Sequence, residues 1–462
     1  MQPYLDRDIP VVVISNITET FFEFPNRAED PAERARLIYH AQSQGDRSLL
    51  WLGDPKLVFN TFPSPHAEYL CQRFGYQGTS FMAPANPSPS LSLDILGEPP
   101  LVSRLIEYTG AERTVQLIPY ATTRQFFQLV EALRMDYGLN ILLPESPRSE
   151  CLWLRDYIDT KAGFRVLVSH WLSDPAELLL PGVVCQDLQQ AAAVAHWFGS
   201  KGQPCILKPD IGMSALGHQT LHPGDFSSPE EILCQLQLNP FLGDDLVVVE
   251  KFIHSSKPLS PSLELFVPSP DAGRPEITYL CDQLFVGFGN SFLLSRELLD
   301  TKWYPPLAES GLLIATRLQE MGYVGHFDID TIVDDEERVF LLEVNSRRTA
   351  GTHIHEFARF FFGPDYLDEV VLLGHGAMKS GAITHSDELL EVIGDLLYPL
   401  QQEKRGVIVT VTSTLLVGDF GCIIVAPSTE EALALQQALT ERIHNARERS
   451  YQGHVYRRDC GA

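Results

Sequence analysis

The sequence lacks the patterns that mark secreted, membrane-spanning and zinc-thiolate proteins. Its eight cysteines are scattered singly through 462 residues, with no Cys-x-x-Cys pair, which indicates free thiols in a reducing compartment. No apolar run approaches the roughly eighteen residues that a membrane helix needs. Acidic residues precede the short apolar run near the N-terminus, unlike a signal peptide. We therefore expect a cytoplasmic protein.

Positive charge is also scarce. The chain has 35 Lys and Arg residues against 60 Asp and Glu residues, a formal net charge of −25. Nucleic acid and anionic membrane surfaces both require a basic footprint on the protein. The composition therefore argues against both partners, and any anionic ligand must be met by a few local cations.

Three common catalytic or nucleotide motifs are missing. No Gly-x-Gly-x-x-Gly follows the first apolar strand, at residues 10–16, which argues against a Rossmann cofactor site. The glycine loop at residues 210–217 is not followed by Gly-Lys-Ser/Thr, as a P-loop requires. The segment GMSALG within it misses Gly-x-Ser-x-Gly by one residue, so Ser214 is not expected to be a nucleophile.

Length and patterning predict a multidomain α/β and α+β protein. A chain of 462 residues with 44% hydrophobic residues should fold into two or three domains. We expect an N-terminal α/β domain over residues 1–148, a core over 149–365 and a small C-terminal α+β domain over 366–462. In the first domain the pattern predicts strands at 10–16, 48–54 and 115–121, helices at 31–44 and 123–137, and an exposed loop at 81–100.

The most informative stretch runs from Gly322 to His355. It predicts a β-hairpin whose second strand carries Glu343, Asn345 and Arg347 at i, i+2 and i+4, on one face. Asp330 on the paired strand can reach the same face. Two carboxylates and an amide oxygen suit Mg²⁺ that also binds phosphate oxygens. The alternative is an ordinary hairpin whose polar residues face water.

Two upstream strands end in further polar groups. Lys208 ends a predicted strand and faces a loop of small residues, whose backbone N–H groups could approach phosphate oxygens. A surface lysine beside a turn is the alternative. The strand LVVVEKFI ends at Ile253, where extended backbone could pair with a purine edge, and Glu264 on the next strand could accept hydrogen bonds from ribose.

In this order, the elements resemble the ATP-grasp superfamily, over about residues 149–363. The resemblance implies two α+β subdomains that close on ATP, with Mg²⁺ or Mn²⁺ as the metal. It implies that Asp330, Glu343 and Asn345 bind the metal and that Lys208 and Arg347 act in catalysis. The implied nucleotide contacts are Lys161, Lys208, Gly212, Met213, Ser214, Gly217, Glu250, Lys251, Phe252, Ile253 and Glu264.

A narrower resemblance is to peptide ligases of the pheganomycin biosynthesis type. It rests on the VVVISN and LLWLGD segments of the first domain, on RRTAGTHIHEFA after the hairpin, and on a small domain at the C-terminus. Arg348, Thr352 and His353 are then expected to contact substrate. The His-x-His pair at His353 and His355 could hold zinc, but no third soft ligand is near.

The resemblance implies an ATP-dependent carboxylate–amine ligase that works through an acyl phosphate and releases ADP and phosphate. Its partners would be a small carboxylate and an amine or peptide, in the biosynthesis of a small peptide or modified amino acid. Dimers are common in this superfamily, so a homodimer is left open. Two alternatives are a small-molecule kinase and a non-catalytic nucleotide-binding protein.

Overall fold

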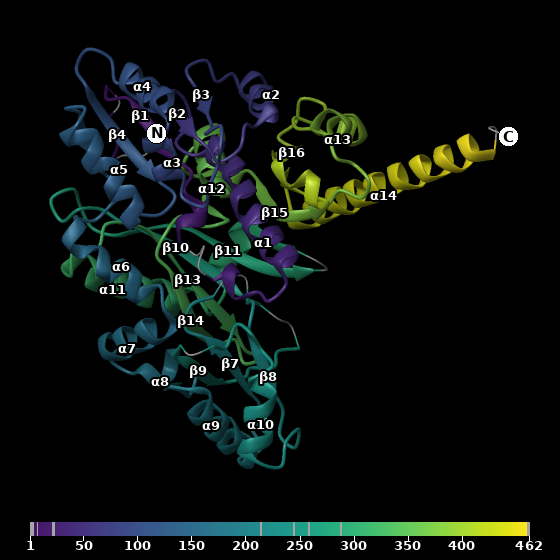
Figure 1. The fold of residues 1–462 in the computed structure, drawn as a ribbon. Coiled ribbons are helices and arrows are strands. Elements are labelled where there is room, and N and C mark those ends of the chain that lie inside the picture. The colour runs from purple at the N-terminus through teal and green to yellow at the C-terminus, as the bar shows by residue number, and fades with distance from the viewer. Residues whose placement is uncertain are drawn as a thin grey trace.

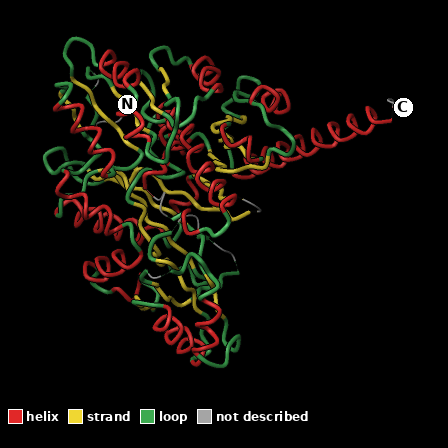
Figure 2. Tube along the Cα trace, viewed as in Figure 1, coloured by secondary structure: helices red, strands yellow, loops and turns green. Residues whose placement is uncertain are grey.

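The computed structural model describes residues 4–6, 8–20, 24–212, 215–243, 245–256, 259–286 and 289–459. Its strands form three sheets, of five, eight and four strands (Figure 1, Figure 2). Within these residues, no helix combines the length and apolarity needed to cross a membrane. The seven cysteines in the described part of the chain are all free thiols.

The first sheet is parallel throughout and lies in the N-terminal region. Its spatial order is β3 (Ser80–Met82), β2 (Leu57–Phe59), β1 (Val11–Ile14), β4 (Thr114–Pro119) and β5 (Asn140–Leu142). The helices of this region are α1 (Pro31–Ser43), α2 (Pro65–Phe74), α3 (Leu91–Gly97), α4 (Pro99–Tyr108) and α5 (Arg124–Met135). The Asn16 side chain ties the segment after β1 to the segment after β4, because its amide donates to the Ala121 carbonyl.

Two local predictions in this region are wrong. Residues 48–54 are not a strand: the 3-10 helix η3 (Gln44–Leu50) and a turn fill this segment, and the strand begins at Leu57. Leu50 and Trp51 are buried, and a short buried apolar run does not distinguish a strand from a helical turn. Residues 81–100 are not one exposed loop, because α3 lies within them and buries Leu91 and Ile95.

The four-stranded sheet is antiparallel and lies at one end of the molecule (Figure 1). Its order is β6 (Gly182–Cys185), β9 (Val247–Lys251), β7 (Cys205–Pro209) and β8 (Gln219–Leu221). Helices α9 (Leu188–Ser200) and α10 (Pro229–Leu236) pack together over it. Helices α6 (Leu152–Ile158), α7 (Lys161–Trp171) and α8 (Pro175–Leu178) precede it in the chain.

The eight-stranded sheet is antiparallel and central. Its order is β14 (Val339–Asn345), β13 (Gly325–Val333), β10 (Pro261–Val267), β11 (Glu276–Val286), β12 (Gly289–Leu294), β15 (Val371–Lys379), β17 (Asp419–Ala426) and β16 (Gly406–Val411). The remaining helices are α11 (Tyr304–Glu320), α12 (Thr352–Phe362), α13 (Ser386–Ile393) and α14 (Thr429–Asp459). Helix α14 extends away from the rest of the chain (Figure 1). The predicted domain boundary lies between residues 365 and 366. Strands from both sides of this boundary belong to the same eight-stranded sheet.

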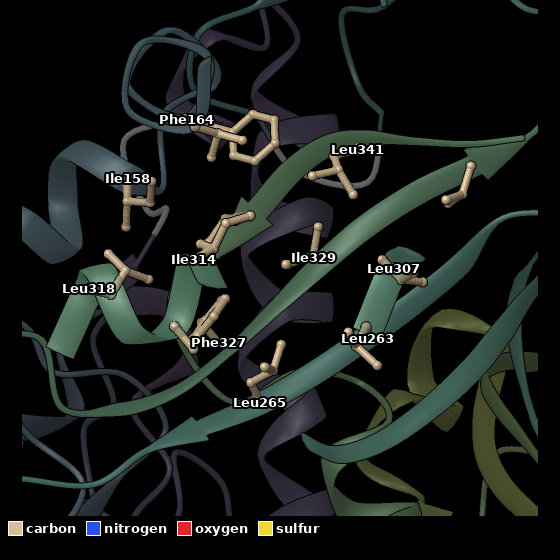
Figure 3. Packing of buried hydrophobic residues seen from close by; sticks show 14 of the residues in the cluster. Ile158, Phe164, Leu263, Leu265, Leu307, Ile314, Leu318, Phe327, Ile329 and Leu341 are labelled. Atoms are coloured by element: carbon tan, nitrogen blue, oxygen red, sulfur yellow. The ribbon is translucent and has the colours of Figure 1, made fainter. Parts of the chain in front are cut away.

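The central sheet is apolar on the face that packs against α11. Leu263, Leu265, Phe327 and Ile329 from β10 and β13 are fully buried there, and Figure 3 shows them with Leu307, Ile314 and Leu318 of α11. Side chains alternate along a strand, so the residues between them lie on the opposite face. That second face carries Ser262, Glu264, Asp328 and Asp330, and it holds the candidate site.

Candidate active site

The hairpin predicted from the sequence is present, and its register brings the acidic residues together. Asp330 of β13 pairs directly with Glu343 of β14, and Asp328 pairs with Asn345. Residues paired across two strands have their side chains on the same face. The structure therefore joins the three predicted metal ligands and adds Asp328, which sequence reasoning missed.

Buried negative charge is concentrated on this face. Asp330 accepts hydrogen bonds from Asn345 Nδ2 at 2.9 Å and from Gln283 Nε2 at 2.5 Å. Burial, followed by repulsion from Glu343, raises the pKa of the Asp330 carboxyl to about 6. Burial and the charge of Asp330 raise the pKa of Asp328 well above its usual value. A bound cation would relieve this repulsion.

Lys161 brings a cation to the same face. Its Nζ lies 2.9 Å from Glu343 Oε2. Burial alone would raise the pKa of Glu343, but the ammonium groups of Lys161 and Lys208 outweigh it, and the pKa falls to about 2. The first turn of α7 is tied to the glycine loop, because the Lys161 N–H donates to the Asp210 carbonyl at 3.0 Å. This contact accounts for the position of Lys161 beside a loop that is distant from it in sequence.

Lys208 is held by Glu250. Lys208 Nζ lies 2.7 Å from Glu250 Oε2, and Arg165 pairs with the other oxygen of the same carboxylate. Burial opposes ionisation of Glu250, yet the two cations keep its pKa below the usual value. The Glu250 side chain is 2% exposed and anchors Lys208. The adenine contact predicted at this strand end, which would use backbone groups, stays a prediction.

The end of β9 leaves one backbone position unused. The N–H groups of Lys251 and Phe252 donate to the carbonyls of Pro181 and Pro204. Among the described residues, Ile253 makes no backbone hydrogen bond. Of the residues predicted to contact adenine, Ile253 is thus the one whose backbone could still pair with a purine edge.

Glu264 is placed differently from its predicted ribose contact. Its side chain has no exposed surface. It accepts hydrogen bonds from Thr278 at 3.0 Å and from the Thr352 hydroxyl, and it pairs with His326 Nδ1 at 3.0 Å. Since protein groups enclose the carboxylate, it offers no accessible oxygen to a ribose hydroxyl. The alternation of side chains along β10 predicted the correct face of the sheet for Glu264, but it did not predict that the carboxylate is fully buried.

Arg347 is oriented by Asp159, a second residue that sequence reasoning missed. Arg347 Nη1 lies 3.1 Å from Asp159 Oδ1, which also accepts hydrogen bonds from the Ser346 N–H at 2.6 Å and hydroxyl at 2.8 Å. Burial would lower the pKa of Arg347, but Asp159 and Tyr120 raise it above its usual value. Asp159 lies in LWLRDYIDTK, and its acidic side chain two residues before Lys161 was the available signal.

Asp159, Lys161, Glu343, Asn345 and Arg347 line one cleft. The residues around it come from the N-terminal region, from α6 and α7, from the glycine loop and from β14. They are Thr20, Asp159, Lys161, Ile211, Gly212, Glu343, Val344, Asn345 and Arg347. Gly212 lies beside Lys161 in this cleft, whereas Met213 and Ser214 lie outside the described residues. Gly217 lies against Phe241.

Arg348 and Thr352 have protein partners in place of the predicted substrate contacts. Arg348 is 1% exposed, donates to both oxygens of Glu145 at 3.0 and 2.6 Å, and donates to Glu356 at 2.8 Å. It therefore links the N-terminal region to α12. The Thr352 hydroxyl donates to Glu264. The side chain of His353 is buried as well, between α12 and the N-terminal region.

The oxygen donors fit magnesium better than a softer metal. Within the described part of the chain, no group of three or more His, Cys, Asp or Glu side chains is placed to hold a metal ion. Asp330, Glu343 and Asn345 supply two carboxylates and an amide. Mg²⁺ accepts few protein ligands when water and phosphate oxygens complete its shell. Burial and the nearby charge of Glu343 raise the pKa of Asp330. A cation bound at this position would account for this concentration of negative charge.

No sequence model of a known protein family matches the chain, and no curated protein sequence does. Solved structures do match. Biotin carboxylase from Campylobacter jejuni, in complex with an ATP analogue, has a TM-score of 0.57 at 14% identity, covering 94% of this chain and 91% of its own. The chain has the ATP-grasp fold.

Two further ATP-grasp structures are similar over nearly the whole chain. N5-carboxyaminoimidazole synthetase from Staphylococcus aureus has a TM-score of 0.52 at 10% identity, covering 95% of this chain and 99% of its own. The biotin carboxylase domain of 2-oxoglutarate carboxylase from Hydrogenobacter thermophilus has a TM-score of 0.52 at 14% identity, covering 94% and 90%. The fold predicted from the motifs is confirmed. The narrower resemblance to pheganomycin-type ligases stays a prediction.

Proposed function

We propose that the protein is an ATP-dependent carboxylate–amine ligase. The observation that carries this proposal is the pairing of Asp330 with Glu343 across the hairpin, next to a cleft that Glu343 lines together with Lys161 and Arg347. Such a site concentrates hard oxygen donors beside two cations. This combination suits a metal-bound nucleoside triphosphate, whose charge the acidic chain could not otherwise accommodate.

The similar structures support this proposal through their ligands. The Hydrogenobacter domain was solved with MgADP, ADP and bicarbonate, and an Aspergillus clavatus N5-carboxyaminoimidazole synthase with ADP and 5-aminoimidazole ribonucleotide (TM-score 0.50, 13% identity). A carboxylate-type substrate and an amine are thus the ligands seen in this fold. We extend both classes to this chain.

We assign the nucleotide to the face between the two antiparallel sheets. Lys161 and Lys208 would contact phosphate oxygens, and the loop from Gly212 to Gly217 would cover them. The free backbone of Ile253 would bind adenine. Glu250 holds Lys208 in place, because it shares its carboxylate between Lys208 and Arg165.

The proposed chemistry follows from charge. A magnesium ion on Asp330, Glu343 and Asn345 would neutralise phosphate oxygens. The substrate carboxylate attacks the γ-phosphate, ADP leaves, and an acyl phosphate forms. Arg347, directed by Asp159, would stabilise the charge that develops on the transferring group. The amine then attacks the acyl carbon, phosphate leaves with the bonding electrons, and an amide remains after the amine loses a proton.

Phosphate release from ATP and Mg²⁺ would test the proposal, with a panel of amino acids and dipeptides and mass spectrometry of the products. The proposal expects phosphate only when a carboxylate and an amine are both present, and a product mass equal to their sum minus water. Glu343→Gln should abolish it, while Glu309→Gln, an exposed carboxylate of α11, should leave it unchanged.

Other outcomes would replace the ligase. ADP with a phosphorylated product and no amine requirement would identify a kinase. Tight ATP binding without turnover on any pair would favour a nucleotide-binding protein without catalysis.

A further inference from the structure

Three polar groups without partners gather where η3 packs against α12. They are Arg47 and Trp51, within and directly after η3, and His353 in the first turn of α12. In the described part of the chain, Arg47 Nε and Trp51 Nε1 are buried and have no hydrogen-bond partner. The two ring nitrogens of His353 are also buried and have no side-chain partner, and the backbone of Ala350 lies near them. His353 is 3% exposed and Trp51 is 1% exposed. Buried polar atoms are nearly always paired in folded proteins, so a group of unpaired donors calls for a cause.

Arg47 is the most unusual of the three. The preceding carboxylate, Asp46, is already occupied, since it accepts hydrogen bonds from the Thr412 N–H at 3.0 Å and from the Ser413 N–H at 2.9 Å. No described residue forms an ion pair with Arg47. Burial lowers the pKa of its guanidinium to about 10. The Arg47 side chain is half-buried. A cation that no described residue neutralises is unfavourable where it is shielded from water, and it is unexpected in a chain with a net charge of −25.

These groups lie close to the catalytic arginine. The charge of Arg47 acts on both Tyr120 and His353. The Tyr120 ring stacks on Trp51, with centroids 6.2 Å apart, and its phenol interacts with Arg347. Tyr120 also lines a cavity with Arg347 at the carboxyl end of β4. One tyrosine side chain therefore separates Arg347 from the unpaired donors.

We propose that Arg47 and His353 form a subsite for a carboxylate on the substrate other than the one that reacts. The reacting carboxylate must lie beside the phosphates, the metal ligands and Arg347. A carboxylate bound at Arg47 would lie on the other side of Tyr120 from Arg347. It would contact the Arg47 guanidinium and the neutral His353 imidazole, which can donate a hydrogen bond from either nitrogen. An amino acid or short peptide that reacts through one group and keeps a second, free carboxylate would fit this arrangement.

The identity of the ligand rests on the proposed ligase function, whereas the existence of an anion subsite does not. Binding is therefore measured without ATP and Mg²⁺, so that a failed ligase assay leaves the result intact. The probes are glutamate, succinate and glycinate, each compared with its neutral amide at constant ionic strength. The readouts are calorimetric affinity and thermal midpoint.

We expect the carboxylates to bind and to raise the midpoint, and the matched amides to do neither. Arg47→Met should weaken carboxylate binding at least tenfold. It should also raise the midpoint of the free protein, because it removes a half-buried charge that no described residue neutralises. His353→Gln should weaken binding and remain folded. Arg36→Gln, which removes an exposed charge from α1, should leave binding unchanged.

Three results would overturn the subsite. One is equal binding of acids and amides. Another is carboxylate binding that survives in both Arg47→Met and His353→Gln. The third is binding that falls equally in Arg36→Gln, which would indicate general screening of charge and not a defined site.

Discussion

The ammonium group of Lys161 lies 2.9 Å from the Glu343 carboxylate, and this ion pair joins the first turn of α7 to strand β14. It couples the helix that precedes the four-stranded sheet to the hairpin that carries the metal ligands. Each partner also has a proposed second role, since Lys161 would contact phosphate and Glu343 would ligate magnesium. The pair therefore holds two halves of the site in register before a nucleotide enters.

Lys161→Met should weaken ATP binding by roughly 10- to 100-fold, because a charge-assisted contact of about 1.5–3 kcal/mol is lost. Glu343 would lose its nearest cation, and its pKa would rise from about 2. Calorimetric titration with ATP and Mg²⁺ measures the affinity. Lys201→Met, at an exposed position after α9, is the matched control. An unchanged affinity in Lys161→Met would remove Lys161 from the nucleotide site.

Binding of Mg²⁺-ATP should weaken as the pH falls below about 6. The Asp330 carboxyl has its pKa raised to about 6, and a protonated carboxyl is a poor metal ligand, so affinity should drop by about tenfold per pH unit below that value. The ATP affinity should be measured from pH 5 to pH 8 at fixed ionic strength. A flat profile would show that Asp330 is not a ligand.

The Asp330 carboxyl predicts the opposite pH trend for the free energy of unfolding. Because its folded-state pKa is above the unfolded value of 3.8, the ionised carboxylate opposes folding above pH 6, and this penalty is relieved as the pH falls from about 6 towards 4. Without metal, Asp330→Asn should therefore be more stable than the parent at pH 8, and the difference should shrink by pH 4. Urea unfolding at both pH values measures it.

Asp159→Asn should reduce turnover by roughly 10²-fold, by analogy with other donors directed at developing charge. Asn keeps an acceptor for Ser346 but loses the charge that holds Arg347, so ATP affinity should change little. The separation of kcat from ATP affinity distinguishes a positioning role from misfolding. Asp156→Asn, on the solvent-exposed side of the same helix, should have no such effect, and a large fall in ATP affinity for Asp159→Asn would contradict this role.

Gly311→Ala should destabilise the core by about 1–3 kcal/mol. A Cβ at Gly311 of α11 would lie 2.7 Å from Leu263 Cδ2 on β10, so the buried Leu263 side chain or the helix would have to shift. Leu263→Ala alone should lose about 2–5 kcal/mol by leaving a cavity. The double variant should lose less than the sum, since the smaller side chain admits the new methyl group. Strict additivity in urea denaturation would show that the two residues do not compete for this space.

Local chemistry was enough to predict much of the site. The spacing of Glu343, Asn345 and Arg347 required only that the segment be a strand, and Asp330 followed from a short charged turn. The strand-end position of Lys208 followed from one apolar run. In each case the decisive geometry lies within a few residues of the motif, where a strand or a hairpin leaves little freedom.

The burial of individual side chains was not predictable from local sequence in the same way. Glu250 and Glu264 each alternate correctly along their strands, yet one neutralises Lys208 and Arg165 and the other is enclosed by His326 and Thr352. Arg348 follows Arg347 directly but turns towards Glu145, nearly two hundred residues earlier in the chain. Asp159 and Asp328 were missed because their partners also come from other elements.

The sequence by itself determined the β-hairpin, the strand-end groups and the ATP-grasp resemblance, because periodicity and short spacings act within single elements. Only the tertiary structure decided which carboxylate contacts Lys161, which arginine lines the cleft beside Asp159, and where Arg47 and His353 come together. Those outcomes depend on the packing of α7, η3 and α12 against sheets formed by distant segments. Burial in such contacts sets the charge state of each group, and no local pattern encodes it.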